Sequence, residues 1–120
     1  MFEVKIETSF SSAHHLLNYK GKCENMHGHN WKVEVTLRGN ELDKANILVD
    51  FKVLKREVND IVEYLDHKDL NELPEFSNES PSSEFIARYI YKKTKEKFIQ
   101  TYRVDVWETP TSRASYFEEG

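Results

Sequence analysis

Apolar and polar side chains alternate along two stretches in the first third of the chain. Apolar residues alternate with charged ones between Phe2 and Ile6, which is the period of a half-buried strand. The same alternation returns between Trp31 and Leu37, and Gly39 and Asn40 then give a turn signal. The pattern therefore predicts two strands in this part of the chain.

The spacing of the apolar residues changes to that of a helix after Asp50, a suitable N-cap. The apolar stripe of this first predicted helix consists of Phe51, Leu54, Val58, Ile61, Val62 and Leu65. A second helix is expected to begin within residues 80–85, with Ser80 or Ser82 as its cap. Its apolar stripe consists of Ile86, Tyr89, Ile90 and Phe98.

Two further strands are expected after the helices. Val104 and Val106 alternate with polar or aromatic residues, and a last short strand is predicted at about Ala114 to Phe117. The predicted order is β-β-α-α-β-β, an α+β fold with an antiparallel sheet and the two helices on one face. At 120 residues the chain is expected to form one domain, residues 1–120.

A small open sheet with long, well-patterned strands has two edges that invite pairing with other chains. Pairing between subunits, with the sheets joined into a closed barrel, removes these edges. The alternative is that charged side chains protect them, since Glu and Lys are frequent here. We expect a barrel-forming oligomer.

Composition excludes several classes of partner. The chain is 38% apolar and 32% charged, which is typical of a globular protein, and its formal net charge of -4 disfavours nucleic acid and anionic membranes. No apolar run approaches the length of a membrane span, and the N-terminal stretch does not resemble a signal peptide. A single cysteine excludes an intrachain disulfide and fits a reducing compartment, so we expect a cytoplasmic protein.

Four of the five histidines fall between positions 14 and 29. Side chains alternate along a strand, so His27 and His29 project from one face. A third imidazole comes from His14 or His15, and the residues alone leave both open. Three imidazoles suit zinc, at roughly 2.0–2.1 Å each, with a fourth position left for water or substrate. A histidine pair of this spacing is, by itself, more often polar strand surface.

The lone cysteine, Cys23, lies four residues before His27. The sequence leaves three roles open for Cys23: a fourth zinc ligand, a reactive thiol or a small buried residue. Its polar neighbours disfavour burial. Lys22 and a nearby metal ion both stabilise a thiolate, the form in which a cysteine acts as a base or nucleophile.

Two further groups of ionisable residues bear on function. Asp66 and His67 are adjacent at the predicted end of the first helix, where a histidine is also stabilised by the helix dipole alone. Glu108 shares its parity with Val104 and Val106, so its carboxylate points to the apolar side. A buried carboxylate needs a partner, which is an Arg, a Lys or a ligand.

Taken together, the motifs of this chain resemble the 6-pyruvoyltetrahydropterin synthase family, and the resemblance extends over nearly the whole sequence. The motifs are F-x-x-A-H at Phe10 to His14, C-x-x-x-H-G-H at Cys23 to His29, V-D-F at Val49 to Phe51, L-D-H-x-x-L-N at Leu65 to Asn71, P-[ST]-x-E at Pro81 to Glu84, and E-T at Glu108 and Thr109. The resemblance implies the tunnelling fold, in which three subunits close a barrel and two barrels stack as a hexamer, a dimer of trimers.

The resemblance also implies roles for individual residues. It assigns zinc binding to His14, His27 and His29, catalysis to Cys23, Asp66 and His67, anchoring of the pterin ring to Glu108, and lining of the pterin pocket to Ser82, Ser83 and Glu84. His15 occupies a position where many relatives have Arg, so its role stays open.

The short length resembles the bacterial and archaeal branch, the 6-carboxy-5,6,7,8-tetrahydropterin synthases of queuosine biosynthesis. The resemblance therefore implies a zinc-dependent carbon-carbon lyase. Its substrate would be 7,8-dihydroneopterin triphosphate, and it would release acetaldehyde and triphosphate. The alternatives are a 6-pyruvoyltetrahydropterin synthase, a folate-type cleavage using Glu24, which follows Cys23 directly, and a non-catalytic module that binds pterin or zinc.

Overall fold

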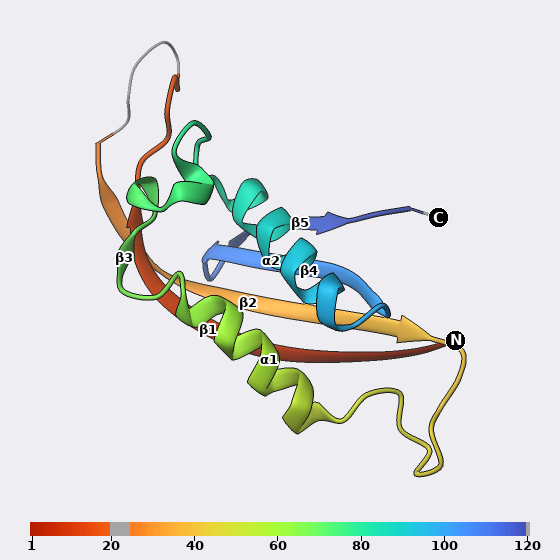
Figure 1. Cartoon of the computed structure of the whole chain (residues 1–120). Helices are drawn as coiled ribbons and strands as arrows, with labels where there is room; N and C mark the ends of the chain where they lie inside the picture. The colour runs from red at the N-terminus through yellow and green to blue at the C-terminus, as the bar shows by residue number, and fades with distance from the viewer. Residues whose placement is uncertain (20–24, 120) are drawn as a thin grey trace.

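The two N-terminal strands are the longest strands in the described part of the computed structural model, which covers residues 1–19 and 25–119 (Figure 1). The alternating stretches recognised in the sequence lie within them, but both strands extend further toward the histidines. The elements in chain order are β1 (Phe2–His14), β2 (His27–Gly39), α1 (Phe51–Glu63), β3 (Lys68–Asp69), the short 3-10 helices η1 (Leu70–Glu72) and η2 (Pro74–Phe76), α2 (Ser83–Lys97), β4 (Thr101–Thr109) and β5 (Ser112–Phe117).

The strands form one sheet in the order β3-β1-β2-β4-β5. The three pairs among β1, β2, β4 and β5 are antiparallel, whereas β3 runs parallel to the end of β1. The prediction of an antiparallel, four-stranded sheet was therefore wrong in this respect, because the sheet has five strands and is mixed. A strand of two residues is too short to show any alternation, so the pattern of side chains could not reveal β3.

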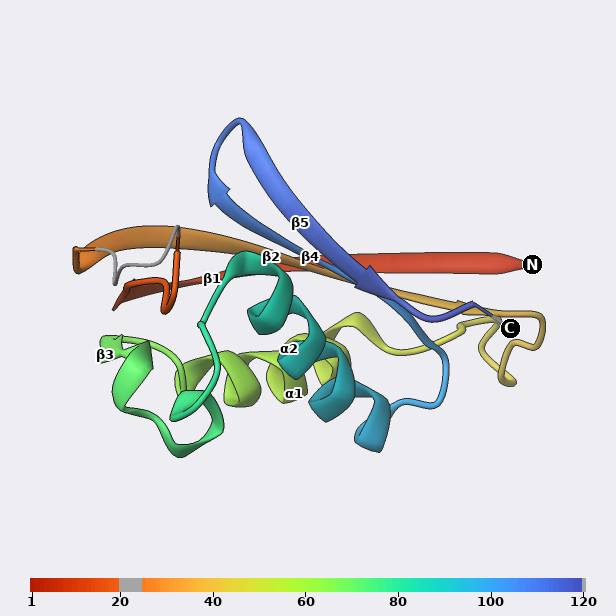
Figure 2. The same ribbon diagram turned by 90° about the horizontal axis from the view of Figure 1, so that it is seen from above.

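Both helices cover the same face of the sheet, as predicted (Figure 2). The core between the layers holds Leu54 and Val58 of α1 and Ile86 and Ile90 of α2, all fully buried. Phe51 was predicted to join this core but is 53% exposed, since it is the first residue of α1 and lines an open hollow outside the layer. No helix in the described part of the chain is long and apolar enough to cross a membrane.

Both predicted caps are confirmed. The Asp50 carboxylate accepts the amide of Lys52 at 2.8 Å and begins α1. The Ser82 hydroxyl accepts the amide of Phe85 at 3.1 Å and begins α2, whereas Ser80, the other candidate, contacts Leu17 instead.

The register of β1 against β2 determines which residues face the helices. His14 is paired with His27, and Ser12 is paired with His29. The alternating stretch that predicted the first strand runs only from Phe2 to Ile6, but β1 continues through His14. The two strand ends therefore bring three imidazoles to the helix-covered face.

A network of charged side chains lies on the opposite face of the sheet. The Asp105 carboxylate accepts hydrogen bonds from Arg103 Nε at 2.9 Å, from an Arg113 guanidinium nitrogen at 2.6 Å, and from the Ser115 hydroxyl. Burial raises the pKa of Asp105, but the hydrogen bonds from Ser115 and Arg103 and the two guanidinium charges outweigh it. The pKa of Asp105 therefore lies below its ordinary value, and the ionised form stabilises the fold.

Asp105→Asn is expected to lower the free energy of unfolding at pH 7 by about 1–3 kcal/mol, because two guanidinium groups lose a charged partner. A depressed pKa gives stability that is present above the unfolded pKa, at about 4, and is lost as the pH falls through the folded pKa. The difference between wild type and variant should therefore shrink in denaturant titrations below about pH 4.

Asp60→Asn, at an exposed position of α1, is the matched control. It should change the unfolding free energy by less than about 0.5 kcal/mol. An equal loss in both variants, or a loss in Asp105→Asn that does not depend on pH, would contradict the role given to the network.

Candidate metal centre and its surroundings

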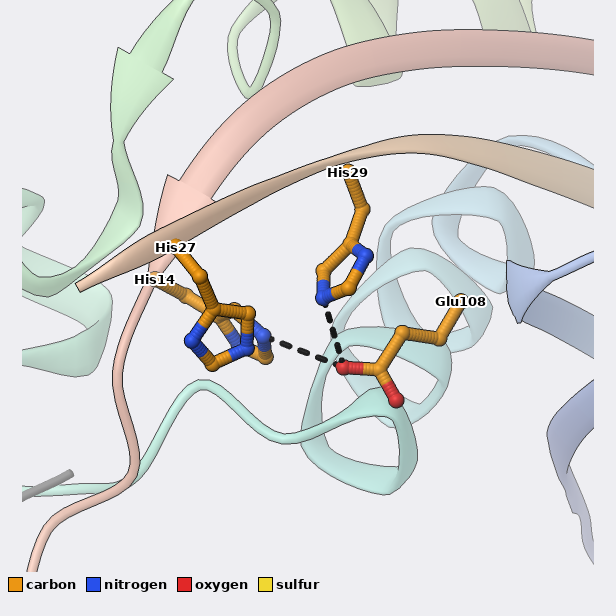
Figure 3. A group of neighbouring side chains, drawn as sticks. All are labelled: His14, His27, His29 and Glu108. Carbon is orange, nitrogen blue, oxygen red and sulfur yellow. Dashed lines mark hydrogen bonds and ion pairs between the residues drawn. The ribbon is translucent and has the colours of Figure 1, made fainter. Parts of the chain in front are cut away.

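Three histidines and one glutamate converge at one end of the sheet. His14 ends β1, His27 and His29 come from the start of β2, and Glu108 reaches in from the end of β4 (Figure 3). Each offers one donor atom, and these four atoms lie within 4.8 Å of one another. The structure thus gathers His14, and not His15, with the pair on β2.

The Glu108 carboxylate lies between two of the imidazoles. Its Oε1 atom is 3.2 Å from His14 Nε2 and 3.0 Å from His29 Nε2, the two contacts dashed in Figure 3. In these two contacts the partners of the carboxylate are therefore histidines, and not the Arg or Lys considered from the sequence. Glu108 is 33% exposed, whereas His14 is almost fully buried.

Backbone carbonyls fix the tautomer of two imidazoles. His14 Nδ1 lies 2.7 Å from the carbonyl oxygen of Pro81, and His27 Nδ1 lies 2.9 Å from that of Asn25. A carbonyl oxygen only accepts hydrogen bonds, so each Nδ1 carries the proton and donates it. In the neutral imidazoles this leaves the Nε2 lone pairs as metal donors, the second-sphere arrangement found at histidine metal sites.

Trp31 packs against the cluster from the core side. Its ring lies edge-on to His14 and His29, with centroids 4.8 and 5.2 Å away, and Phe10 stacks on it at 5.8 Å. The indole Nε1 donates to the carbonyl oxygen of Ser12 at 3.2 Å. This fully buried indole restricts the rotamers of two ligand candidates and closes one side of the cluster to water.

The donor set fits a divalent metal ion. Imidazole nitrogens and a carboxylate oxygen are borderline donors that suit zinc and neighbouring transition metals better than calcium or magnesium. Three imidazoles alone satisfy a catalytic zinc, and Glu108 supplies either a fourth donor or a group for the substrate. The cluster is thus a metal site by its chemistry, while its metal is a matter for experiment.

Asp66 and His67 form a second polar pair, held against β1. His67 Nδ1 lies 2.8 Å from Asp66 Oδ2, and Asp66 Oδ1 accepts the amide of Ser11 at 2.8 Å. The hydrogen bond from the Ser11 amide, and then that from His67, lower the pKa of Asp66. The carboxylate is therefore ionised at neutral pH and orients the His67 ring through Nδ1, which leaves Nε2 for proton exchange.

The position of this pair differs from the sequence prediction. The α1 helix ends at Glu63, so Asp66 and His67 lie in the turn that follows it. His67 has a positive φ of 54°, which is uncommon for a residue other than glycine, and its amide donates to the Ser11 carbonyl at 2.6 Å. Its side chain is 81% exposed, and with His29 it lines an open hollow of about 560 Å³.

The remaining predicted residues surround the start of α2 or fall outside the description. Ser82 and Ser83 are half-buried and Glu84 is exposed, next to the Pro81 carbonyl that His14 contacts. Cys23 and Glu24 lie outside the described residues. Asn25 and Pro81 were missed as partners of the histidines, because a backbone carbonyl leaves no signature in the identity of its residue.

Comparisons with known proteins agree with this geometry. A family model described as 6-pyruvoyl tetrahydropterin synthase matches residues 3–119. A 6-carboxy-5,6,7,8-tetrahydropterin synthase from Synechocystis sp. is 37% identical over 98% of this chain and 94% of its own. A protein of the same name from Bacillus subtilis is 35% identical, over 96% and 84%.

A solved structure gives the same answer for the fold. The 6-pyruvoyl tetrahydropterin synthase of Caenorhabditis elegans superimposes with a TM-score of 0.87 at 29% identity, covering 98% of this chain and 96% of its own. The family match spans nearly the whole chain, and the histidine motifs that suggested it form one cluster. This chain belongs to the 6-pyruvoyl tetrahydropterin synthase family of enzymes.

Proposed function

We propose that this enzyme is a zinc-dependent 6-carboxy-5,6,7,8-tetrahydropterin synthase. It converts 7,8-dihydroneopterin triphosphate to 6-carboxytetrahydropterin, with release of acetaldehyde and triphosphate, in queuosine biosynthesis. The observation that carries the proposal is the cluster of three imidazoles and Glu108, found in a chain that relatives of this name match over most of their length. The predicted cytoplasmic location belongs to this proposal.

His14, His27 and His29 hold the metal through Nε2, with the Nδ1 atoms of His14 and His27 tied to backbone carbonyls. When bound, zinc supplies Lewis-acid polarisation of the hydroxyl groups on the substrate side chain. The burial of His14 and the packing of Trp31 limit how far these rings can move. The protein thus contributes a rigid ligand set.

Glu108 anchors the pterin ring in this proposal. The pterin edge presents neighbouring ring N–H and amino donors, and a carboxylate accepts both in a planar pair. Glu108 lies directly beside the imidazoles, so a ring held there lies next to the metal ligands. We further propose that Ser82, Ser83 and Glu84 line the pterin pocket.

Proton transfer is assigned to three residues. Cys23, as a thiolate, removes a proton from the substrate side chain, and His67 exchanges protons as acid or relay. Asp66 orients the His67 ring because its carboxylate stays ionised and accepts a hydrogen bond from His67 Nδ1, with 2.8 Å between Nδ1 and Oδ2. The side chain of His67 is exposed, so a substrate bound at the surface of the chain can reach it.

We also propose a hexamer built from two barrels of three chains. Strand β3 pairs with only two residues of β1, Ser12 and Ala13, so most of the outer edge of β1 has no neighbouring strand within the described chain. Strand β5 is the other edge, and Phe2 and Phe117, one on each edge strand, are 48% and 42% exposed. Pairing of these two edges between subunits satisfies the unpaired backbone groups of both edges and covers the side chains of Phe2 and Phe117.

Two rivals use the same pocket. A 6-pyruvoyltetrahydropterin synthase eliminates triphosphate without cleaving the side chain, and a folate-type enzyme cleaves it with Glu24 in the catalytic role. A non-catalytic module that binds pterin or zinc is a third reading. The Asp66–His67 pair disfavours it, because binding alone needs no oriented imidazole with one nitrogen left open.

Incubation of the zinc-loaded protein with 7,8-dihydroneopterin triphosphate should yield 6-carboxytetrahydropterin and acetaldehyde, detected by mass spectrometry. Cleavage is expected because relatives named 6-carboxy-5,6,7,8-tetrahydropterin synthase are 37% and 35% identical to this chain. A 6-pyruvoyl product without acetaldehyde would move the chain to the first rival, and unchanged substrate would leave only the binding module.

Cys23→Ala and Glu24→Gln separate the catalytic roles in the same assay. Cys23→Ala should retain zinc and lose turnover by about 10²–10⁴-fold, the usual contribution of a general base. Glu24→Gln should have a mild effect. Near-normal turnover in Cys23→Ala together with a severe loss in Glu24→Gln would favour the folate-type reading.

Metal analysis should find about one zinc per chain and its loss on His14→Ala, His27→Ala or His29→Ala, since two remaining imidazoles hold the ion poorly. His15→Ala is the matched control and should retain zinc, because His15 lies outside the cluster. Retention in both strand β2 variants would exclude the site.

Glu108→Gln distinguishes the two roles of the carboxylate. We expect this variant to keep its zinc and to bind pterin less tightly by about 1.5–3 kcal/mol, because an amide offers one acceptor oxygen where the carboxylate offers two. Loss of zinc with unchanged pterin affinity would make Glu108 a metal ligand instead.

Light scattering should report six chains per particle at micromolar concentration, since the sheet edges pair between subunits. Ile99→Ser, at an exposed loop position away from both edge strands, should leave the mass unchanged. A monomer for the wild-type chain would contradict the proposed assembly.

A further inference from the structure

Two side chains bind the backbone of the segment that directly follows β1. Asn71 Oδ1 accepts the amide of His15 at 2.9 Å, and Asn71 Nδ2 donates to the carbonyl of His15 at 3.0 Å. The Ser80 hydroxyl accepts the amide of Leu17 at 2.7 Å and donates to the carbonyl of Leu17 at 3.0 Å. Each side chain therefore binds both the N–H and the C=O group of a single residue.

These contacts continue a ladder that begins further back on β1. The backbone of Ser11 is held by the Asp66 carboxylate and the His67 amide, and Ala13 is paired with Asp69 of β3. His15 and Leu17 then take side-chain partners at the same spacing of two residues. Alternate residues of a strand direct their N–H and C=O groups to the same edge. His15 and Leu17 follow the end of β1, and there Asn71 and Ser80 bind the groups that a neighbouring strand would otherwise pair with.

His14 lies between the residues held in this way. Its own backbone faces β2, where it is paired with His27, while its neighbours Ala13 and His15 are held at the outer edge. The backbone of His14 is thus fixed from both edges of β1. Because χ1 and χ2 start from this backbone, its position determines where Nε2 can point.

Ser80 also influences the ring of His14. It directly precedes Pro81, whose carbonyl oxygen lies 2.7 Å from His14 Nδ1 and accepts a hydrogen bond from it. The two hydrogen bonds of Ser80 to Leu17 therefore hold that carbonyl against the segment that follows His14 at the end of β1. Without them the segment before α2 is free to move away from β1 and to take the acceptor with it.

We propose that Asn71 and Ser80 are positioning residues for the metal ligand His14, an inference that rests on the proposed metal site. Asn71 fixes the backbone that follows His14, and Ser80 fixes the carbonyl that orients its ring. Neither residue contacts the metal donors themselves, so each acts through another group. A purely structural role predicts a lower unfolding temperature with unchanged metal affinity in the folded protein.

The test is the dissociation constant of zinc, measured by competition with a chromophoric chelator on folded protein well below its unfolding temperature. Asn71→Ala and Ser80→Ala should each weaken zinc binding by about tenfold, the lower end of the effect of second-sphere partners. Ser80→Thr keeps the hydroxyl and should restore most of the affinity. Circular dichroism checks that each variant is folded.

Two control variants match the substitutions. Asn59→Ala removes an asparagine whose Oδ1 accepts a hydrogen bond from the Thr8 hydroxyl in the middle of β1, and Ser77→Ala removes an exposed serine three residues before Ser80. Both should bind zinc within about twofold of the wild type.

Unchanged zinc affinity in Asn71→Ala and Ser80→Ala, or equal losses in the controls, would overturn the positioning role and leave the metal site intact. A wild-type chain that binds no zinc would remove the metal site and the positioning role together. If Asn71→Ala does not fold, the Ser80→Ala and Ser80→Thr pair decides alone, because a gain in affinity from Ala to Thr requires the hydroxyl.

Discussion

The site depends on the register in which β1 pairs with β2. Pairing of His14 with His27, and of Ser12 with His29, brings three imidazoles to one face at the end of the sheet. A slip of one residue would turn the histidines of β2 to the opposite face, since side chains alternate along a strand. Burial of the apolar residues that follow the histidines along β2, Trp31 above all, fixes this register. The core therefore determines the metal site.

A second constraint comes from the segment between the helices. Its residues supply the acceptor for His14 Nδ1, the hydrogen bonds to His15 and Leu17 after the end of β1, and the Asp66–His67 turn beside Ser11. The same stretch thus supports the ligand set and carries the Asp66–His67 pair, for which we propose proton transfer. Its short elements, two 3-10 helices and a strand of two residues, follow the edge of β1 more closely than a long helix can.

Much of the fold could be predicted from the sequence because its main elements are periodic. Alternation indicated β1 and β2, and Asp50 marked the start of α1. The sequence could not separate His14 from His15 by spacing alone, and only the family resemblance favoured His14. The structure explains this choice, because β1 continues through His14 and turns its side chain toward the core.

Contacts that involve the backbone were beyond sequence reasoning. Asn71 belongs to a recognised motif, yet its pairing with the peptide groups of His15 depends on where β3 ends. Ser80 was considered as a helix cap, a common role for serine, and instead contacts Leu17. Such roles follow from the tertiary arrangement and not from the identity of neighbouring residues.

X-ray absorption at the zinc edge tests the central claim most directly, because it reports the ligands of the metal in the folded enzyme. The account predicts three imidazole nitrogens at about 2.0–2.1 Å and no sulfur, with Cys23 left free as a base. The Cys23→Ala variant should give the same spectrum. A sulfur ligand at about 2.3 Å, or fewer than three imidazoles, would contradict the ligand set derived from the end of β1 and the start of β2.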